Sequence, residues 1–116
     1  MHIAVVGVNH QTAPVSVREK ITIGADNLPK ALAALTSSVP QGLILSTCNR
    51  TEIYSVDGNS DSAAEANLSF LKNRLNGYGA ELDKYVYVLK DEAAVEHLYD
   101  LTSGLDSMII GEYEIL

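Results

Sequence analysis

Residues 42–56, GLILSTCNRTEIYSV, constrain the fold more than any other stretch, because two β-rich apolar runs are separated there by one short polar segment. The run at 43–45 predicts a buried strand, and the run at 53–56 predicts a second strand that pairs with it. Residues 46–51 are then the connection at one end of a sheet. The rest of the chain has to supply the neighbours of this strand pair.

The connection contains Cys48, the only cysteine in the sequence, and Arg50 lies two positions later. A thiol at a sheet end is exposed enough to react, and a nearby guanidinium favours the thiolate, the form that attacks a carbonyl carbon. The alternative is an inert, buried cysteine that acts as a small hydrophobic residue. The polar neighbours Thr47 and Asn49 favour the reactive interpretation.

Strands and helices are expected to alternate along the remaining sequence. The expected elements are a strand at 3–8, a short helical segment within 15–23, a helix from 27 that stops at 37–40, a helix at 61–76, a strand at 85–89 and a helix at 92–103. Asp91 should cap the last helix and Gly104 should end it. With the central strand pair, this order predicts an α+β, ferredoxin-like βαββαβ sandwich, with an antiparallel sheet, helices packed on one face and an extra helix at the C-terminus.

Composition indicates one ordinary globular domain, residues 1–116, with 47% hydrophobic and 20% charged residues. The N-terminal segment MHIAVVGVNH lacks the features of a signal peptide, and no apolar run approaches membrane-spanning length. A cytoplasmic protein with no membrane contact is therefore expected. The tail brings apolar residues without a stop signal, which indicates that a longer protein continues beyond it.

Charge and cysteine content argue against several kinds of site. Eight Lys and Arg against fifteen Asp and Glu give a formal net charge of −7, and the basic residues are scattered. General nucleic-acid-binding domains carry a basic face, so no DNA partner is expected. One cysteine cannot form an intramolecular disulfide, and no His/Cys cluster has zinc spacing, so no metal site is expected. The segment GVNHQTAP lacks both glycine-rich phosphate-binding patterns, which argues against a nucleotide site.

His97 is the second candidate for chemistry. It shares a helical face with Ala93, Ala94 and Leu101, which are expected to point inward. One interpretation is a core histidine whose hydrogen bonds are satisfied. The other is a base or hydrogen-bond partner that faces Cys48, and the spacing leaves both open.

Arg50 also has two interpretations. It is either a solvated arginine in a turn or a bidentate clamp on a substrate carboxylate beside the nucleophile. Weaker polar candidates either form turns and caps or line a substrate pocket. They are Thr47, Asn49, Ser107 and the pair Asn9 and His10 at the end of the first strand.

Three segments together resemble the N-terminal domain of glutamyl-tRNA reductase. VVGVNHQTAPVSVREK, STCNRTEIY and AVEHLYDLTSGLDSMIIGE match in order and spacing and span nearly the whole chain. The resemblance implies the catalytic domain of an enzyme that begins the C5 route to tetrapyrroles and haem. In that family a cysteine takes the glutamyl group from glutamyl-tRNA as a thioester, and hydride from NADPH then releases glutamate-1-semialdehyde.

The resemblance assigns roles to individual residues. Cys48 is the implied nucleophile, His97 is the implied histidine important for activity, and Arg50 is implied to hold the glutamate side chain. The other implied substrate contacts are Thr47, Asn49, Ser107, Glu112, Tyr113 and Glu114. Glu114 departs from the family, which has glutamine at this position, and its carboxylate adds like charge near a glutamyl substrate.

The resemblance also implies parts that these 116 residues lack. They are a Rossmann domain that binds NADPH and a helical domain through which the full-length protein forms a homodimer. No cofactor is expected in this chain, and slow hydrolysis of the glutamyl ester is the most that it should catalyse alone. The implied partner is the aminoacylated 3′ end of glutamyl-tRNA, with a regulatory protein and a downstream aminomutase as further candidates.

Two other functions stay open. A non-catalytic ferredoxin-like module could bind a regulator or another subunit, and it would not need a reactive Cys48. A free-standing cysteine hydrolase is disfavoured, because no acidic residue is evidently placed to orient His97.

Overall fold

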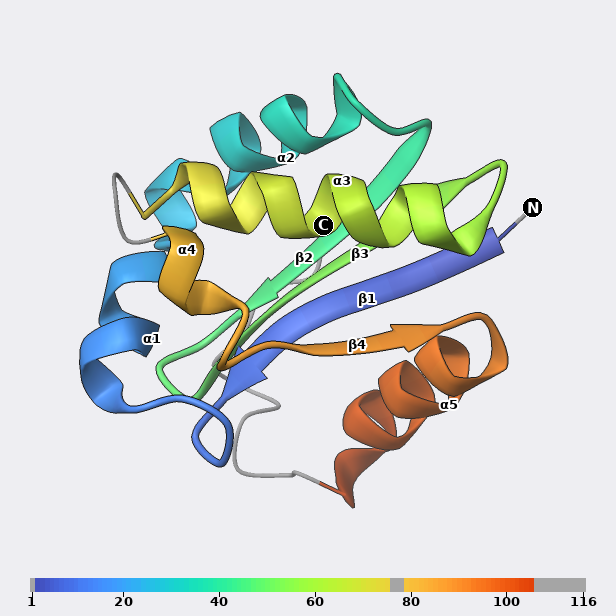
Figure 1. Cartoon of the computed structure of the whole chain (residues 1–116). Helices are drawn as coiled ribbons and strands as arrows, with labels where there is room; N and C mark the ends of the chain where they lie inside the picture. The colour runs from blue at the N-terminus through green and yellow to red at the C-terminus, as the bar shows by residue number, and fades with distance from the viewer. Residues whose placement is uncertain (1, 76–78, 106–116) are drawn as a thin grey trace.

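A computed structural model describes residues 2–75 and 79–105. Four strands form one sheet in the order β2-β3-β1-β4, and every neighbouring pair is antiparallel (Figure 1). The strands are β1 (His2–Asn9), β2 (Gln41–Ser46), β3 (Arg50–Asp57) and β4 (Tyr87–Lys90). The predicted α+β class with an antiparallel sheet is confirmed. The last strand begins two residues later than the apolar pattern at 85–89 predicts.

Five α-helices and two other helical turns are found among the described residues. They are α1 (Val15–Ile21), α2 (Leu28–Thr36), α3 (Ser60–Asn73), α4 (Gly79–Leu82) and α5 (Glu92–Asp100), with the 3₁₀ turn η1 (Ala25–Asn27) before α2 and the π-helical turn η2 (Leu101–Leu105) after α5. The helix α4 was not expected. None of the helices in the described ranges is long and apolar enough to cross a membrane.

The two largest hydrophobic cores of the described residues lie on opposite faces of the sheet. The larger core joins one face to α1, α2, α3 and α4, and it includes Val6, Ile21, Leu35, Ile53 and Leu71. The smaller core joins the other face to α5, and its buried members are Val5, Tyr54 and Ala94. Figure 1 shows α2 and α3 on one side of the sheet and α5 on the other. The extra helix predicted near the C-terminus therefore covers the face that the other helices leave open.

Strand register brings Glu52 and Tyr87 into one row of the sheet. Glu52 of β3 pairs with Gly7 of β1, and Gly7 pairs on its other side with Tyr87 of β4. Because side chains alternate along a strand, Arg50 and Glu52 share the face that Tyr54 presents to α5. The row places polar side chains from two strands beneath this helix.

Asp91 makes the tight connection from β4 to α5, but it does not cap the helix. It occupies the N-cap position with φ of 51° and makes no side-chain capping bond, so the predicted cap is wrong. Its carboxylate instead accepts a hydrogen bond from the backbone N–H of Ile3 at 3.3 Å and lies 3.0 Å from Nδ1 of His2. The turn therefore ties α5 to the start of β1.

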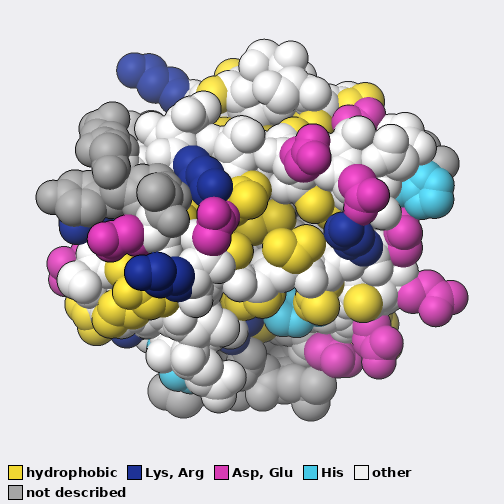
Figure 2. Space-filling model, in the orientation of Figure 1, with side chains coloured by type: hydrophobic (Ala, Val, Ile, Leu, Met, Phe, Trp, Pro, Cys, Tyr) yellow, Lys and Arg dark blue, Asp and Glu magenta, His cyan; other side chains and the backbone are white. Residues whose placement is uncertain are grey.

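Basic side chains do not gather on the face drawn in Figure 2. There, Lys and Arg stand apart from one another, with acidic side chains between them. Among the ion pairs of the described residues, Nζ of Lys90 lies 2.5 Å from Oδ1 of Asp61. On this face the scattered charge expected from the sequence is confirmed.

Candidate active site

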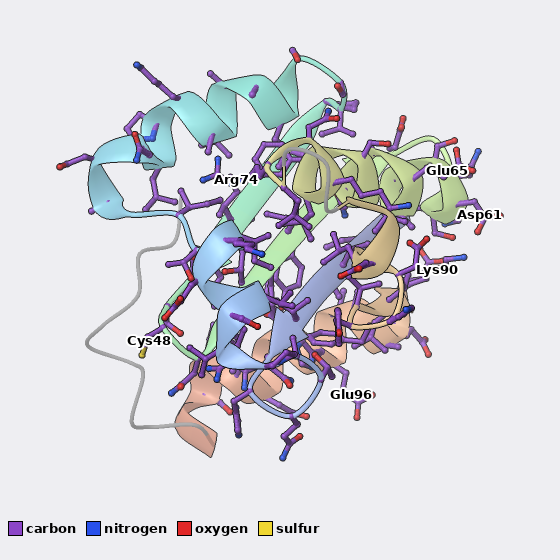
Figure 3. The ribbon with its side chains drawn as sticks, turned by 60° about the vertical axis from the view of Figure 1, so that its left-hand side comes forward. Cys48, Asp61, Glu65, Arg74, Lys90 and Glu96 are labelled. Atoms are coloured by element: carbon purple, nitrogen blue, oxygen red, sulfur yellow. The ribbon has the colours of Figure 1, made fainter. Side chains whose placement is uncertain are left out.

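Cys48 lies at the tip of the three-residue turn between β2 and β3. The turn is closed by a hydrogen bond of 2.7 Å from the Thr47 backbone N–H to the Arg50 carbonyl. The Thr47 hydroxyl accepts hydrogen bonds from the backbone N–H groups of Asn49 and Arg50, at 3.1 and 3.2 Å. Cys48 is exposed and its side chain points away from the sheet (Figure 3). The predicted exposure is confirmed, and the alternative of a buried cysteine is wrong.

The base of this turn is fixed to the segment that follows α1. The buried hydroxyl of Ser46 accepts a hydrogen bond from the backbone N–H of Ile23 at 2.9 Å and lies 3.0 Å from the Thr51 hydroxyl. Arg18 of α1 donates from Nη1 to the Cys48 carbonyl at 3.1 Å. The backbone that carries the thiol is therefore held from two directions.

A surface cavity of about 520 Å³ opens beside the thiol. Its lining residues are Val15, Arg18, Glu19, Thr22, Cys48 and Asn49. Arg18 is also held by a hydrogen bond of 3.2 Å from its Nε to the Ala13 carbonyl. The cavity leaves Cys48 accessible to a bulky reactant from the α1 side.

Arg50 begins β3 and is buried. Only 6% of the residue is exposed, so the interpretation as a solvated turn arginine is wrong. Its Nη1 lies 3.4 Å from Oε2 of Glu52, two residues along the same face. The guanidinium is therefore buried on the face that Glu52 shares, with one nitrogen held near its carboxylate.

Glu52, which was not among the residues expected at the site, is the centre of the polar cluster. It is fully buried, which requires partners for its charge. The Tyr54 hydroxyl donates to Oε1 at 2.8 Å. At Oε2, the Tyr87 hydroxyl donates a hydrogen bond and Nε2 of His97 lies 2.5 Å away. With Arg50, four side chains surround one carboxylate.

The cluster keeps Glu52 ionised. Burial alone would raise the pKa of this carboxyl group, but hydrogen bonds from His97, Tyr87 and Tyr54 outweigh it and hold the pKa below its usual value. Burial raises the pKa of both Tyr54 and Tyr87, and the neighbouring charge of Glu52 raises each further. Both hydroxyls therefore stay protonated and act as donors.

His97 projects from α5 toward this cluster. Its side chain is 26% exposed, and its ring lies edge-on to Tyr87 with 5.7 Å between the ring centroids. Ala94 and Leu101, on the same helical face, are buried as expected, whereas Ala93 is exposed. Within the described residues, the hydrogen-bonding partner of His97 is Glu52. An acidic residue therefore does orient His97, contrary to expectation, because the fold brings Glu52 to its ring from a strand far away in sequence.

Gly7 lets this cluster extend across β1. A Cβ atom at this position would lie 2.9 Å from Cγ of Glu52 and 2.9 Å from the hydroxyl oxygen of Tyr87, closer than side-chain atoms normally approach. Only a residue without a side chain leaves room for these two groups to meet. The glycine does not belong to a phosphate loop, because it lies within a strand.

The remaining candidates fall into three groups. Asn49 is exposed beside the thiol, and Thr47 forms the turn. The Asn9 carboxamide accepts hydrogen bonds from the backbone N–H groups of Gln11 and Thr12 at 2.8 and 3.1 Å, so it shapes the turn that contains the exposed His10. The candidates Ser107, Glu112, Tyr113 and Glu114 lie outside the described residues. Across residues 2–75 and 79–105, no group of three acidic, histidine or cysteine side chains could hold a metal ion.

These observations define an α+β domain with an exposed thiol at one sheet end and a buried carboxylate that pairs with a partly exposed imidazole from α5. Residues 6–116 match the family model described as "Glutamyl-tRNAGlu reductase, N-terminal domain". The chain therefore belongs to the family of glutamyl-tRNA reductase N-terminal domains.

Similar proteins agree with this assignment along the whole chain. Glutamyl-tRNA reductase of Paenibacillus macerans is 43% identical and that of Prochlorococcus marinus 45% identical, each matched over 100% of this chain and 27% of its own length. The solved structure of glutamyl-tRNA reductase from Methanopyrus kandleri is similar with a TM-score of 0.60 and 27% identity, over 95% of this chain and 24% of that one. The chain thus spans about a quarter of the length of these relatives.

Proposed function

We propose that residues 1–116 are the domain of a glutamyl-tRNA reductase that accepts the glutamyl group from glutamyl-tRNA. Sγ of Cys48 attacks the carbonyl carbon of the ester, a C–S bond forms, and the ester C–O bond breaks. The thiol loses its proton, and the ribose oxygen of the tRNA leaves and takes one up. The observation that carries the proposal is an exposed thiol on a fixed turn, two residues from the buried Arg50.

Arg50 supports the choice of a glutamyl substrate. A planar guanidinium with a fixed orientation can hold a carboxylate at two points, which a freely rotating ammonium group cannot do. Glu52 supplies the fixed orientation. We assign Arg50 to the glutamate side chain, Thr47 and Asn49 to the pocket wall, and His97 to proton transfer. Ser107, Glu112, Tyr113 and Glu114 stay in the proposal as further substrate contacts.

Reduction of the thioester belongs to another part of the full-length protein in this proposal. NADPH would supply the hydride that releases glutamate-1-semialdehyde. The described residues do not fit this cofactor, because the sheet is antiparallel and the space around Gly7 is filled by Glu52 and Tyr87. We therefore assign NADPH binding and dimerisation to the three quarters of the relatives that the chain does not span.

The topology supports the ferredoxin-like assignment. Helix α2 connects β1 to β2, α3 connects β3 to β4, and the strand order is β2-β3-β1-β4. This is the order expected when two βαβ units are interleaved in one antiparallel sheet. We propose that α5 is an addition to this framework. It places His97 over the face of the sheet that α1, α2, α3 and α4 leave uncovered.

The acyl transfer can be tested directly. The protein is incubated with glutamate-labelled glutamyl-tRNA, quenched in acid and analysed by intact mass and peptide mapping. A glutamyl adduct on Cys48 is expected, and Cys48→Ser is the control. A folded protein that shows neither an adduct nor faster deacylation of the tRNA would contradict the proposal and favour a non-catalytic binding module.

Hydrolysis of the same thioester is a second candidate activity. The hydrogen bond between Glu52 and His97 favours it, because a neutral imidazole held by a carboxylate can accept a proton from water. Without hydride, the chain would then act as a slow glutamyl-tRNA esterase. Release of free glutamate after the adduct has formed would distinguish this activity from a stable thioester.

A further inference from the structure

We propose that Glu52 is a positioning residue that holds His97 with its proton on Nε2, so that Nδ1 carries the lone pair and is the ring nitrogen that can accept a proton. The role of Nδ1 rests on the proposed function. The assignment of the proton to Nε2 rests on the geometry of the cluster alone.

Three groups meet the same oxygen of Glu52. The Tyr87 hydroxyl, Nε2 of His97 and Nη1 of Arg50 all contact Oε2. Arg50 is a permanent donor with no lone pair to offer, so this oxygen must act as an acceptor. An acceptor requires the nitrogen that faces it to carry hydrogen. The remaining ring nitrogen of a neutral His97 is then Nδ1, and it holds the lone pair.

The carboxylate is built into the sheet so that it cannot turn away. Glu52 is fully buried, and the Tyr54 hydroxyl fixes its other oxygen. A buried ionised group is not needed to fill a core, since apolar side chains do so at least as well. His97 is the cluster member on α5, and part of its ring reaches the surface. Because the sheet holds Glu52 in place, the hydrogen bond between Glu52 and His97 fixes the orientation of the imidazole.

The arrangement also couples substrate binding to proton transfer. Arg50 and His97 both contact Oε2, although one begins β3 and the other lies on α5. A glutamyl carboxylate bound at Arg50 would change the electrostatic potential at Oε2 of Glu52. The strength of the hydrogen bond between His97 and Oε2 would change with it. Loss of Glu52 is therefore expected to affect both selection of the substrate and the rate of acyl transfer.

The tautomer can be measured without any activity. Long-range ¹H–¹⁵N correlation spectra of histidine-labelled protein, recorded where the imidazole is neutral, distinguish hydrogen on Nε2 from hydrogen on Nδ1. His97→Gln identifies the signals of His97. Hydrogen on Nε2 is expected, and hydrogen on Nδ1 would overturn the proposal. Because no acylation is needed, this result stands apart from the success or failure of the proposed function.

A double-mutant cycle tests whether Glu52 acts through His97. The intact protein that contains this chain is used, and the rate constant for forming the Cys48 adduct is measured. Glu52→Gln should lower it roughly 10²-fold, the lower end of what a positioned acid or base supplies. In the background of His97→Ala, the same change should have little further effect on that rate constant. An equal loss in both backgrounds would overturn the proposal.

Val5→Ala is the control for damage to the fold. It removes apolar atoms from the smaller core, to which α5 belongs, and leaves the hydrogen bonds of Glu52 in place. It should lower the free energy of unfolding without changing the His97 tautomer or the adduct rate. If Val5→Ala slows acylation as much as Glu52→Gln, general loss of packing explains both effects, and Glu52 has no specific positioning role.

Discussion

Nε2 of His97 lies 2.5 Å from Oε2 of Glu52, although 45 residues separate them in the sequence. One residue comes from the helix on the smaller core and the other from the middle of β3, so tertiary structure alone brings them together. Acid–base pairs of this kind orient an imidazole in many enzymes that use a side-chain nucleophile. Here Glu52 lies four residues after Cys48 in the sequence, whereas His97 reaches it from a distant helix.

Cys48→Ser is expected to abolish formation of the glutamyl adduct, because a hydroxyl is far less nucleophilic than a thiolate. The side chain is exposed, so the free energy of unfolding should change by less than about 0.5 kcal/mol. Intact-mass analysis and urea denaturation measure the two effects. A serine variant that still gains a glutamyl group would place the nucleophile elsewhere.

Arg50→Lys is expected to weaken the preference for glutamyl-tRNA over glutaminyl-tRNA by roughly tenfold or more, since a hydrogen bond to a charged group contributes about 1.5–3 kcal/mol. The ammonium group cannot reproduce the planar contact that Glu52 orients. Competition between the two aminoacyl-tRNAs for adduct formation measures this preference. Arg74→Lys, which lies at the C-terminal end of α3, is the control. Unchanged discrimination in the Arg50 variant would remove it from substrate selection.

Gly7→Ala is expected to destabilise the protein by about 1–3 kcal/mol, because the new methyl group overlaps Glu52 and Tyr87. Chemical denaturation measures the loss. Gly58→Ala is a suitable control, since nothing lies within 4 Å of a Cβ atom built there. Equal free energies of unfolding for Gly7→Ala and Gly58→Ala would contradict this prediction. Glu52 and Tyr87 would then be able to move away from the new methyl group without loss of stability.

Acid should destabilise the protein through Glu52. The pKa of its carboxyl group is lower in the folded protein than its ordinary value of 4.5, so the unfolded chain takes up a proton first as the pH falls. The stabilisation is present above pH 4.5 and is lost as the pH falls through the folded pKa. The free energy of unfolding of Glu52→Gln should therefore depend less on pH in this range than that of the unmodified protein. Parallel pH curves would contradict the linkage.

Local sequence patterns were sufficient to predict most of the sheet and the turn. The hairpin around Cys48 follows from two apolar runs with a polar interruption, and the exposure of the thiol follows from its polar neighbours. Helix α4 was missed because the nearby glycines indicate a break, and burial around it comes from distant residues. The cap at Asp91 failed because its carboxylate bonds to β1, which no local pattern reveals.

Glu52 was missed for a related reason. A charged residue inside a strand pattern is usually expected to face solvent, and its burial depends on which helix covers that face of the sheet. One signal was present in the sequence. Arg50, Glu52 and Tyr54 alternate along β3, so a polar row on a single face could have been predicted from their spacing.

The smaller core has a consequence for heating. Helix α5 holds His97, and among the described residues the buried members of its core are Val5, Tyr54 and Ala94, far fewer than in the core on the other face. Elements with few buried contacts open at lower free energy than the rest of a domain. The imidazole should therefore leave the carboxylate at temperatures where the sheet is still intact. Thermal inactivation would then precede thermal unfolding, and amide protons of α5 would exchange with solvent before those of β1 and β3.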